Sequence, residues 1–337
     1  MIIHKGAVAK RPQSLPYIQP MESKYDFQFL LYNNMRKLIY LIFLAALTAG
    51  CSGKQKEETA KNSLQDSVEL LEMPLIPSEI TDPNQRVDYL VIHFWDGLDF
   101  KDTLLTHNRD FLEQNFANFS QALIISNDSS ARRKGAATLM KKAEADSVVY
   151  KMLSEIAYHY LYDPNSPMLD EESFIPFMEI FKDSELLNEA ERERNRFLLQ
   201  NALKNRPGMR AADFTYVTND GKTTSLYKTP VKGNLLVIFY DPDCDNCKEI
   251  IGKLAESPGL REMINQGDIS LLAIYSGENK KLWDETAPSL PKEWTIGYNS
   301  GSIEDNDDYF FRASPTIYFL DNNKNILVKD LSPSRLP

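Results

Sequence analysis

The chain is poor in the residues that most often bind metal ions, with three cysteines and four histidines among 337 residues. Cys244 and Cys247 stand in the stretch YDPDCDNCK, and Cys51 lies far upstream. No histidine follows residue 159, so the two neighbouring thiols lack the four ligands of a structural zinc site. The acidic residues around them miss the EF-hand pattern, which requires Gly and Glu where Asn246 and Gly252 stand. We therefore expect no metal site and no cofactor.

Long apolar runs and clusters of basic residues are also missing. No apolar stretch reaches the roughly 18–20 residues of a helix that spans a bilayer. Asp and Glu outnumber Lys and Arg by 48 to 38, which gives a formal net charge of −10. Because phosphate contacts need clustered Lys and Arg, we expect no nucleic-acid partner.

A targeting segment lies inside the N-terminal region. Residues 35–51 read MRKLIYLIFLAALTAGC, with a basic start, a short apolar run and small residues before Cys51. This arrangement resembles a bacterial lipoprotein signal, which predicts a signal peptide over residues 35–50 and lipidation of Cys51. Met35 opens the signal, so we interpret residues 1–34 as an extension of the gene model. Residues 51–77 begin with a polar, charged stretch and are predicted to form a flexible tether to the membrane.

Residues 78–205 carry apolar residues at helical spacing. Asp82 and Pro83 form a typical helix start, and an apolar face follows over residues 87–95. Further apolar faces fall within residues 111–125, 147–162, 171–181 and 189–203, and the last is expected to turn Phe197, Leu198 and Leu203 inward. We predict an all-α domain of five or six helices that carries no catalytic motif.

The pattern changes after Pro207. The segment 214–217 and the turn at residues 219–221 indicate a hairpin, and the run 234–240 is typical of a buried central strand. We expect a helix from Cys244 to Leu254, strands over 269–275 and 294–298, a helix over 303–313 and a final hairpin over 316–330. Cys244 and Cys247 fall between the first buried strand and its helix, and Pro315 directly precedes the hairpin.

This order resembles the thioredoxin family, in which a CxxC motif opens a helix and a cis-proline faces it. The resemblance covers about residues 210–331 and is closest to the membrane-tethered thiol–disulfide oxidoreductases of bacterial envelopes. The preceding segment, including HFWDGLDF at residues 93–100, resembles the helical domain of unknown function that often precedes such modules. We predict an α+β chain, with the all-α domain followed by a thioredoxin-like α/β domain at 210–337 whose central sheet is flanked by helices.

The resemblance assigns roles to the site residues. Cys244, at a helix N-terminus that stabilises a thiolate, is the predicted nucleophile, and Cys247 resolves the mixed disulfide. Pro315 in the cis form is expected to shape the substrate groove, and Ser314 to present its backbone to the substrate. We place Tyr240, Pro242 and Asp243 in the same groove.

Two positions depart from the family pattern. Asp243 replaces the aromatic residue that often precedes the first cysteine, and two carboxylates now flank Cys244 and oppose the helix dipole. We therefore expect a reductase-like rather than a strongly oxidising protein. Ile238 occupies the place of the buried Asp of thioredoxins, so Glu249 or a residue elsewhere has to replace it as proton acceptor. The final helix of the family is expected to be short or absent.

The predicted function is a membrane-anchored thiol–disulfide oxidoreductase, reductase-like or isomerase-like, that acts on exported proteins. Its partners would be the thiols and disulfides of those proteins and an unidentified electron donor of the membrane or envelope. Its location would be the cell envelope, lipid-anchored, with the thioredoxin-like domain in the periplasm. The alternative is a non-catalytic binding or adaptor lipoprotein built on the same scaffold. A peroxidase is disfavoured because Asp241 stands where the peroxiredoxin pattern requires Thr.

Overall fold

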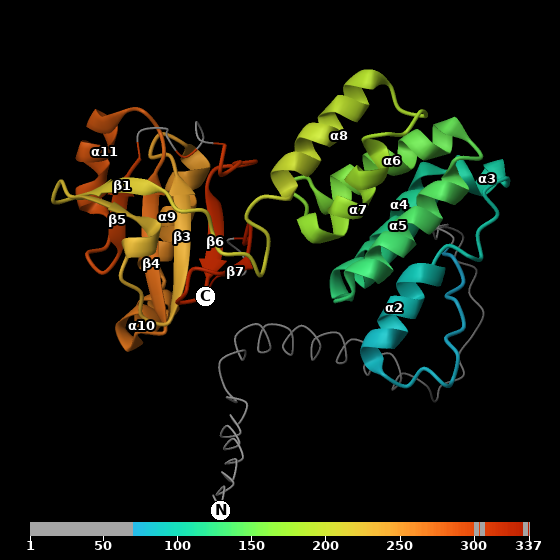
Figure 1. Cartoon of the computed structure of the whole chain (residues 1–337), viewed down its shortest axis with the longest axis horizontal. Helices are drawn as coiled ribbons and strands as arrows, with labels where there is room; N and C mark the ends of the chain where they lie inside the picture. The colour runs from blue at the N-terminus through green and yellow to red at the C-terminus, as the bar shows by residue number, and fades with distance from the viewer. Residues whose placement is uncertain (1–69, 300–302, 304–306, 333–335, 337) are drawn as a thin grey trace, which may run out of the picture. The chain divides into compact units, whose positions relative to one another are not determined.

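The computed structural model describes residues 70–299, 303, 307–332 and 336 (Figure 1). The predicted extension, signal peptide, lipidation site Cys51 and most of the tether lie outside the described residues. Within the described part, helices dominate residues 83–202, and every strand lies after residue 214. No helix there combines the length and apolar character needed to cross a bilayer.

Seven helices make up the described N-terminal part. They are α2 (Pro83–His93), α3 (Thr103–Thr106), α4 (Arg109–Ile125), α5 (Ser129–Ala143), α6 (Ser147–Leu161), α7 (Glu171–Phe181) and α8 (Glu189–Ala202). An Asp or Asn side chain accepts a hydrogen bond from the first turn of each helix; these caps are Asp82, Asp102, Asn108, Asp128, Asp146, Asp170 and Asn188. Such caps satisfy backbone N–H groups that have no partner inside the helix.

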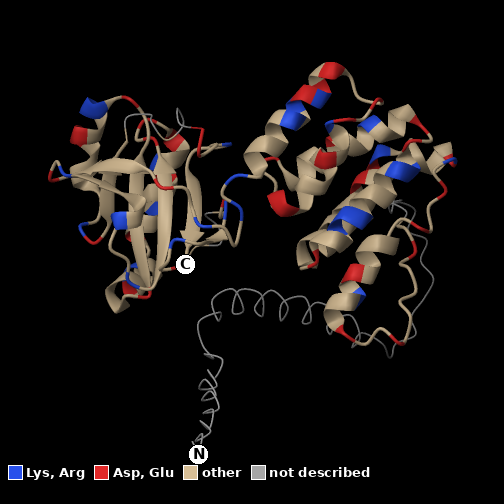
Figure 2. Ribbon diagram, viewed as in Figure 1, with Lys and Arg blue, Asp and Glu red and all other residues tan. Residues whose placement is uncertain are grey.

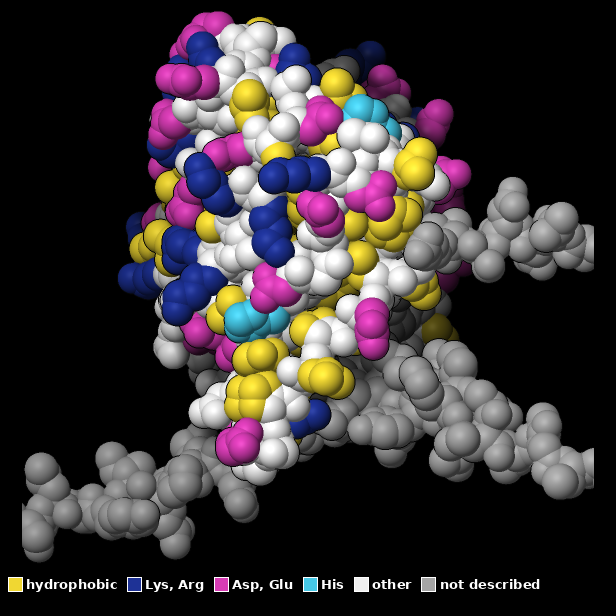
Figure 3. Space-filling model, turned by 90° about the vertical axis from the view of Figure 1, so that its right-hand side faces the viewer, with side chains coloured by type: hydrophobic (Ala, Val, Ile, Leu, Met, Phe, Trp, Pro, Cys, Tyr) yellow, Lys and Arg dark blue, Asp and Glu magenta, His cyan; other side chains and the backbone are white. Residues whose placement is uncertain are grey.

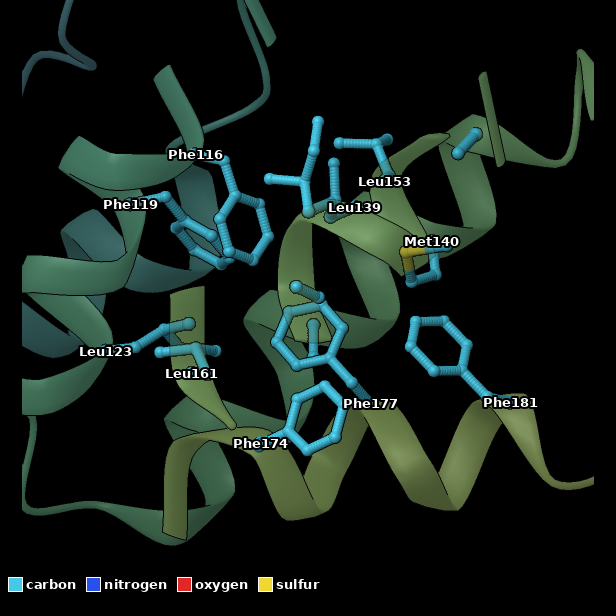
Figure 4. Close-up of a cluster of buried hydrophobic side chains, with 14 of the residues drawn as sticks. Phe116, Phe119, Leu123, Leu139, Met140, Leu153, Leu161, Phe174, Phe177 and Phe181 are labelled. Atoms are coloured by element: carbon cyan, nitrogen blue, oxygen red, sulfur yellow. The ribbon is translucent and has the colours of Figure 1, made fainter. Parts of the chain in front are cut away.

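Aromatic side chains fill the core of this helical part (Figure 4). Phe116 of α4 lies edge-on to Phe119, with ring centroids 6.0 Å apart, and 5.8 Å from Phe177 of α7. Phe181 meets the ring of Tyr150 of α6 at 6.2 Å. Because each buried aromatic ring removes a large apolar area from water, this cluster stabilises the packing of α4, α6 and α7.

The helix prediction was correct in type but too low in number. The helices α2, α4, α6, α7 and α8 lie where apolar faces were expected, whereas α3 and α5 were missed. Helix α5 packs through small residues such as Ala131, Gly135 and Ala136, which give a weak apolar pattern. The inward placement of Phe197 and Leu203 was wrong, since their side chains are 52% and 41% exposed.

Charged residues on the surface of the helical part are mixed in sign. Figure 2 shows acidic and basic segments interleaved along α8, and Figure 3 shows both kinds side by side on one face. Many form exposed ion pairs, such as Arg133 with Glu179 at 2.9 Å. Exposed pairs of this kind contribute at most about 1 kcal/mol each, so the core carries most of the stability.

Residues from 215 onward build a seven-stranded mixed sheet. Its strands are β1 (Thr215–Thr218), β2 (Thr223–Ser225), β3 (Asn234–Tyr240), β4 (Ile269–Tyr275), β5 (Thr295–Tyr298), β6 (Thr316–Leu320) and β7 (Ile326–Val328). Their order is β2-β1-β5-β4-β3-β6-β7. Strands β3, β4 and β5 run parallel, while β6 is antiparallel to β3. The predicted strands and both hairpins are confirmed.

The two faces of the sheet are covered differently. Helices α9 (Asp245–Glu256), α10 (Pro258–Gln266) and α11 (Lys280–Thr286) contribute to the core on one face. On the other face, segments around Phe214 and Tyr309 pack against Phe239 of β3. Helices α10 and α11 were not predicted. The helix expected over 303–313 is wrong for residues 307–313, which the structure describes as non-helical.

Candidate functional site

Cys244 stands at the start of α9, directly after the loop that follows β3. It is the N-cap of that helix, and its Sγ accepts a hydrogen bond from the backbone N–H of Cys247 at 3.3 Å. A sulfur in this position receives the free N–H groups and the positive end of the helix dipole. These donors face the sulfur that would attack a disulfide in thiol–disulfide exchange.

Cys247 lies one turn further along α9 and is fully buried, whereas Cys244 is partly exposed. Both are free thiols in the structure. Burial raises the pKa of Cys247 to about 11, against the opposing effect of a hydrogen bond with Ser314. The outer thiol is thus accessible to a substrate, and the inner thiol holds its proton at neutral pH.

The loop before β6 faces both cysteines. The Ser314–Pro315 peptide bond is cis, the form that the resemblance implies for Pro315. The carbonyl oxygen of Ser314 lies 3.8 Å from Sγ of Cys244, and the Ser314 hydroxyl lies 3.1 Å from Sγ of Cys247. Ser314 therefore contacts the two sulfurs through different atoms. From the sequence we assigned only its backbone a role and did not foresee that of its hydroxyl.

Asn246, between the two cysteines, also contacts this loop. Its side-chain amide donates a hydrogen bond to the carbonyl oxygen of Ser314 at 3.0 Å. The contact ties the first turn of α9 to the residue before Pro315. We did not identify Asn246 from the sequence; its position inside the CxxC motif was the one available signal.

The acidic residues around Cys244 are arranged unequally. A side-chain oxygen of Asp241 accepts a hydrogen bond from the backbone N–H of Asp243. The carbonyl oxygen of Asp241 accepts one from the N–H of Cys244, so Asp241 shapes the turn. The side chains of Asp243 and Asp245 are 86% and 100% exposed. Lys248 places Nζ 3.2 Å from Asp245 and 3.4 Å from the carbonyl oxygen of Asp243. Solvent and Lys248 thus weaken the effect of these carboxylates on the cysteine pair.

The other predicted groove residues lie at different depths. Tyr240 is buried, its ring lies 6.3 Å from that of Tyr275, and its hydroxyl has no hydrogen-bond partner among the described residues. Tyr240 and Ser314 both line an open hollow of about 340 Å³. Pro242 is buried in the turn and, like the exposed Asp243, is not part of the hollow's lining.

The buried acid of thioredoxins has no replacement at Ile238, which is fully buried in β3. Glu249, considered as a substitute, points to solvent and forms an ion pair with Lys253 at 2.5 Å. The polar side chain that does reach Cys247 is Ser314. Among the described residues, no group of three or more His, Cys, Asp or Glu side chains is placed to hold a metal ion.

Comparisons with known proteins match both parts of the chain. The family model described as "Domain of unknown function (DUF5106)" matches residues 50–205. A thioredoxin-like protein from Bacteroides caccae, known from its crystal structure, is 32% identical to this chain. The match covers 80% of this chain and 96% of that one, with a TM-score of 0.69.

Two further solved structures match the chain over a shorter length. A conserved protein of unknown function from Bacteroides fragilis is 41% identical over 38% of this chain and 93% of its own, with a TM-score of 0.36. A domain of a possible thiol-disulfide isomerase from Cytophaga hutchinsonii is 20% identical, and the match covers 39% of this chain and 88% of that one, with a TM-score of 0.33. No protein with a curated description matches significantly. On the match to nearly the full length of the Bacteroides caccae protein, the chain belongs to the thioredoxin-like proteins.

Proposed function

We propose that this protein is a membrane-anchored thiol–disulfide oxidoreductase that acts on exported proteins through Cys244 and Cys247. The observation that carries the proposal is the contact of both sulfurs with one residue, Ser314, directly before cis-Pro315. An accessible thiol at a helix N-terminus, a buried thiol one turn away and a facing loop are the parts that disulfide exchange requires.

In the first step, the Cys244 thiolate attacks one sulfur of a substrate disulfide. A bond forms between Sγ of Cys244 and that sulfur while the substrate disulfide breaks, and the other substrate sulfur leaves as a thiolate that takes a proton from water. The N–H of Cys247, 3.3 Å from Sγ of Cys244, stabilises the attacking charge.

In the second step, Cys247 loses its proton and attacks Sγ of Cys244. The mixed disulfide breaks, the substrate leaves as its second thiolate, and a Cys244–Cys247 disulfide forms. The substrate has gained two electrons and the protein has lost two, so a dithiol donor has to reduce the pair for the next cycle. The Ser314 hydroxyl, 3.1 Å from the Cys247 sulfur, supports the thiolate in this step.

The proposed location follows from the N-terminal sequence. Lipidation of Cys51 after removal of residues 35–50 would hold the protein at a membrane of the cell envelope, with the thioredoxin-like domain in the periplasm. One lipid-modified residue and a flexible tether would allow the cysteine pair to reach exported proteins near the membrane. Disulfides persist in that compartment, so the pair would find substrates there.

Differential alkylation tests whether the pair is catalytic. The purified reduced protein is treated with iodoacetamide at pH 7, and the labelled cysteine is identified by mass spectrometry of its peptides. Catalysis predicts that Cys244 is labelled at least about tenfold faster than Cys247, and that Cys247→Ser leaves the Cys244 rate high. Equally slow labelling of both cysteines would contradict the proposal and favour a non-catalytic adaptor.

A further inference from the structure

A second, partly open cavity begins at cis-Pro315 and is bounded on one side by the segment between α6 and α7. Its volume is about 180 Å³. Pro164, Pro167 and Leu169 line it from the segment between α6 and α7, and Pro315, Ile317 and Leu331 line it from the sheet part. Ser314, which contacts both cysteines, directly precedes Pro315, which lines this cavity.

Buried charges hold the two sides of the cavity together. Both sides belong to one unit of the chain, residues 66–337. Glu171, at the start of α7, lies 2.6 Å from Nζ of Lys329 and 3.7 Å from the guanidinium of Arg312, and Arg312 also pairs with Asp330. None of these four side chains is more than 13% exposed. Each charge is paired, as burial requires, so the contact has a defined geometry.

Arg312 links this ion cluster to the wall of the cavity. Its guanidinium lies 4.3 Å from the ring centroid of Tyr162 and donates to the Tyr162 carbonyl oxygen at 3.4 Å. Tyr162 is the C-cap of α6, two residues before Pro164, and Arg312 stands three residues before Pro315. One side chain therefore fixes the distance between the two walls.

The segment that forms the helical wall is itself well held. The Ser166 hydroxyl donates a hydrogen bond to the carbonyl oxygen of Tyr160 at 2.6 Å. The backbone N–H of Asp170 donates one to the carbonyl oxygen of Leu161 at 3.0 Å. These bonds close residues 161–170 into a compact loop. Pro164 and Pro167 add fixed backbone angles, so the wall is formed before anything binds.

The size and lining of the cavity indicate what it holds. A cavity of about 150 Å³ accepts a benzene-sized apolar group, and this one is slightly larger. Three proline rings and the side chains of Leu169, Ile317 and Leu331 offer apolar surface. The polar residues of the lining are Ser166, Arg312, Thr316, Asp330 and Ser332. Arg312 and Asp330 pair with each other, and the hydroxyls of Ser166 and Thr316 donate to backbone carbonyl oxygens. An extended chain advances about 3.3 Å per residue, so a substrate held at Ser314 reaches the cavity within two or three residues of its cysteine.

We propose that this cavity receives an apolar side chain of the substrate polypeptide, next to its reacting cysteine, and that the helical domain thereby selects substrates. The proposal rests on the proposed oxidoreductase function. It gives the domain of unknown function a role as one wall of the substrate site. The occupant is a segment of extended or unfolded protein, because a folded surface would not present one side chain to a cavity bounded on two sides.

The test compares peptide substrates with a small disulfide. Each peptide has one cysteine, which is blocked as a mixed disulfide with 5-thio-2-nitrobenzoate. Each peptide of the set carries one leucine, at one of the three positions before or the three positions after the cysteine. An all-serine peptide is the reference. Release of the coloured thiolate is followed for the reduced wild-type protein and for Pro167→Asp. Asn165→Asp is the matched control, because it introduces the same charge in the same loop. Asn165 is exposed and does not line the cavity.

For the wild type and Asn165→Asp, leucine in at least one position should raise kcat/KM about tenfold over the all-serine peptide. For Pro167→Asp, this preference for leucine should fall to about twofold or less. All three proteins should reduce the small reagent 5,5′-dithiobis(2-nitrobenzoate) at equal rates. Absence of a leucine preference in the wild type, or its persistence in Pro167→Asp, would overturn the proposal. Failure of the wild type with the small reagent would instead refute the oxidoreductase function.

Discussion

The hydroxyl oxygen of Ser314 lies 3.1 Å from the sulfur of Cys247, although 67 residues separate them in the sequence. Strand pairing produces this contact, because β6 follows Ser314 and lies beside β3, whose end leads into α9. Ser314 opposes the effect of burial on the pKa of Cys247. With Ile238 in place of a buried acid, this hydroxyl is the polar side chain that contacts the resolving thiol.

Substitution of Ser314 by Ala should slow the second step of exchange. Loss of one hydrogen bond of about 1 kcal/mol to the developing thiolate corresponds to a roughly fivefold lower rate of substrate release. The mixed disulfide on Cys244 should accumulate and can be quantified by acid quench and mass spectrometry. Ser314→Thr retains the hydroxyl and serves as the control. Equal release rates for Ser314→Ala and the wild type would exclude this role.

The stability of the reduced protein should fall between pH 9 and 11. The pKa of Cys247 is raised from 9.0 to about 11 in the folded state, mainly by burial. In this window the unfolded chain has lost the thiol proton while the folded chain keeps it, so rising pH favours unfolding. The loss attributable to Cys247 is about 2–3 kcal/mol. Urea unfolding of the wild type and Cys247→Ala at pH 9 and pH 11 measures this loss. An equal change in the free energy of unfolding for the two proteins would contradict the assignment.

Removing the carboxylate of Glu171 should destabilise the contact between the helical part and the sheet part. Glu171→Gln leaves Lys329 and Arg312 with one buried counter-charge fewer, a loss of about 3 kcal/mol. Glu189→Gln is the control, because Glu189 also pairs with arginines but is 63% exposed, so this substitution should destabilise the protein less than Glu171→Gln does. Urea unfolding compares the two variants. Similar losses would show that the buried cluster contributes no more than a surface pair.

Cys51 should determine membrane attachment. When the full chain is expressed in a bacterium that processes lipoproteins, Cys51→Ala should leave the protein out of the membrane fraction, while the wild type stays in it. Mass spectrometry of the mature wild-type protein should find lipidated Cys51 at its N-terminus. Retention of Cys51→Ala in the membranes would show that another feature provides the attachment.

The sequence predicted elements with strong periodicity better than contacts between distant residues. β3, β4, α4 and α7 follow clear apolar patterns and lie where expected. Helix α5 was missed because its buried face consists largely of small residues such as Gly135 and Ala136, whose side chains carry little apolar surface.

Of the site, Cys244, Cys247 and cis-Pro315 were available from a motif and its context. The backbone role of Ser314 was also predicted, whereas the contacts of its hydroxyl, of Asn246 and of the loop at Pro167 arise from tertiary packing. Neither spacing nor composition encodes which side chain will meet Cys247, or which loop will border a cavity at Pro315.

The most direct test of the account is the reduction potential of the Cys244–Cys247 couple. The purified protein is equilibrated in thiol redox buffers, and the oxidised fraction is measured by alkylation of the free thiols. Electron exchange predicts a potential between about −120 and −280 mV, the span of thioredoxin-fold catalysts. A potential below about −300 mV, together with slow alkylation of Cys244, would make the pair a structural disulfide and contradict the proposed function.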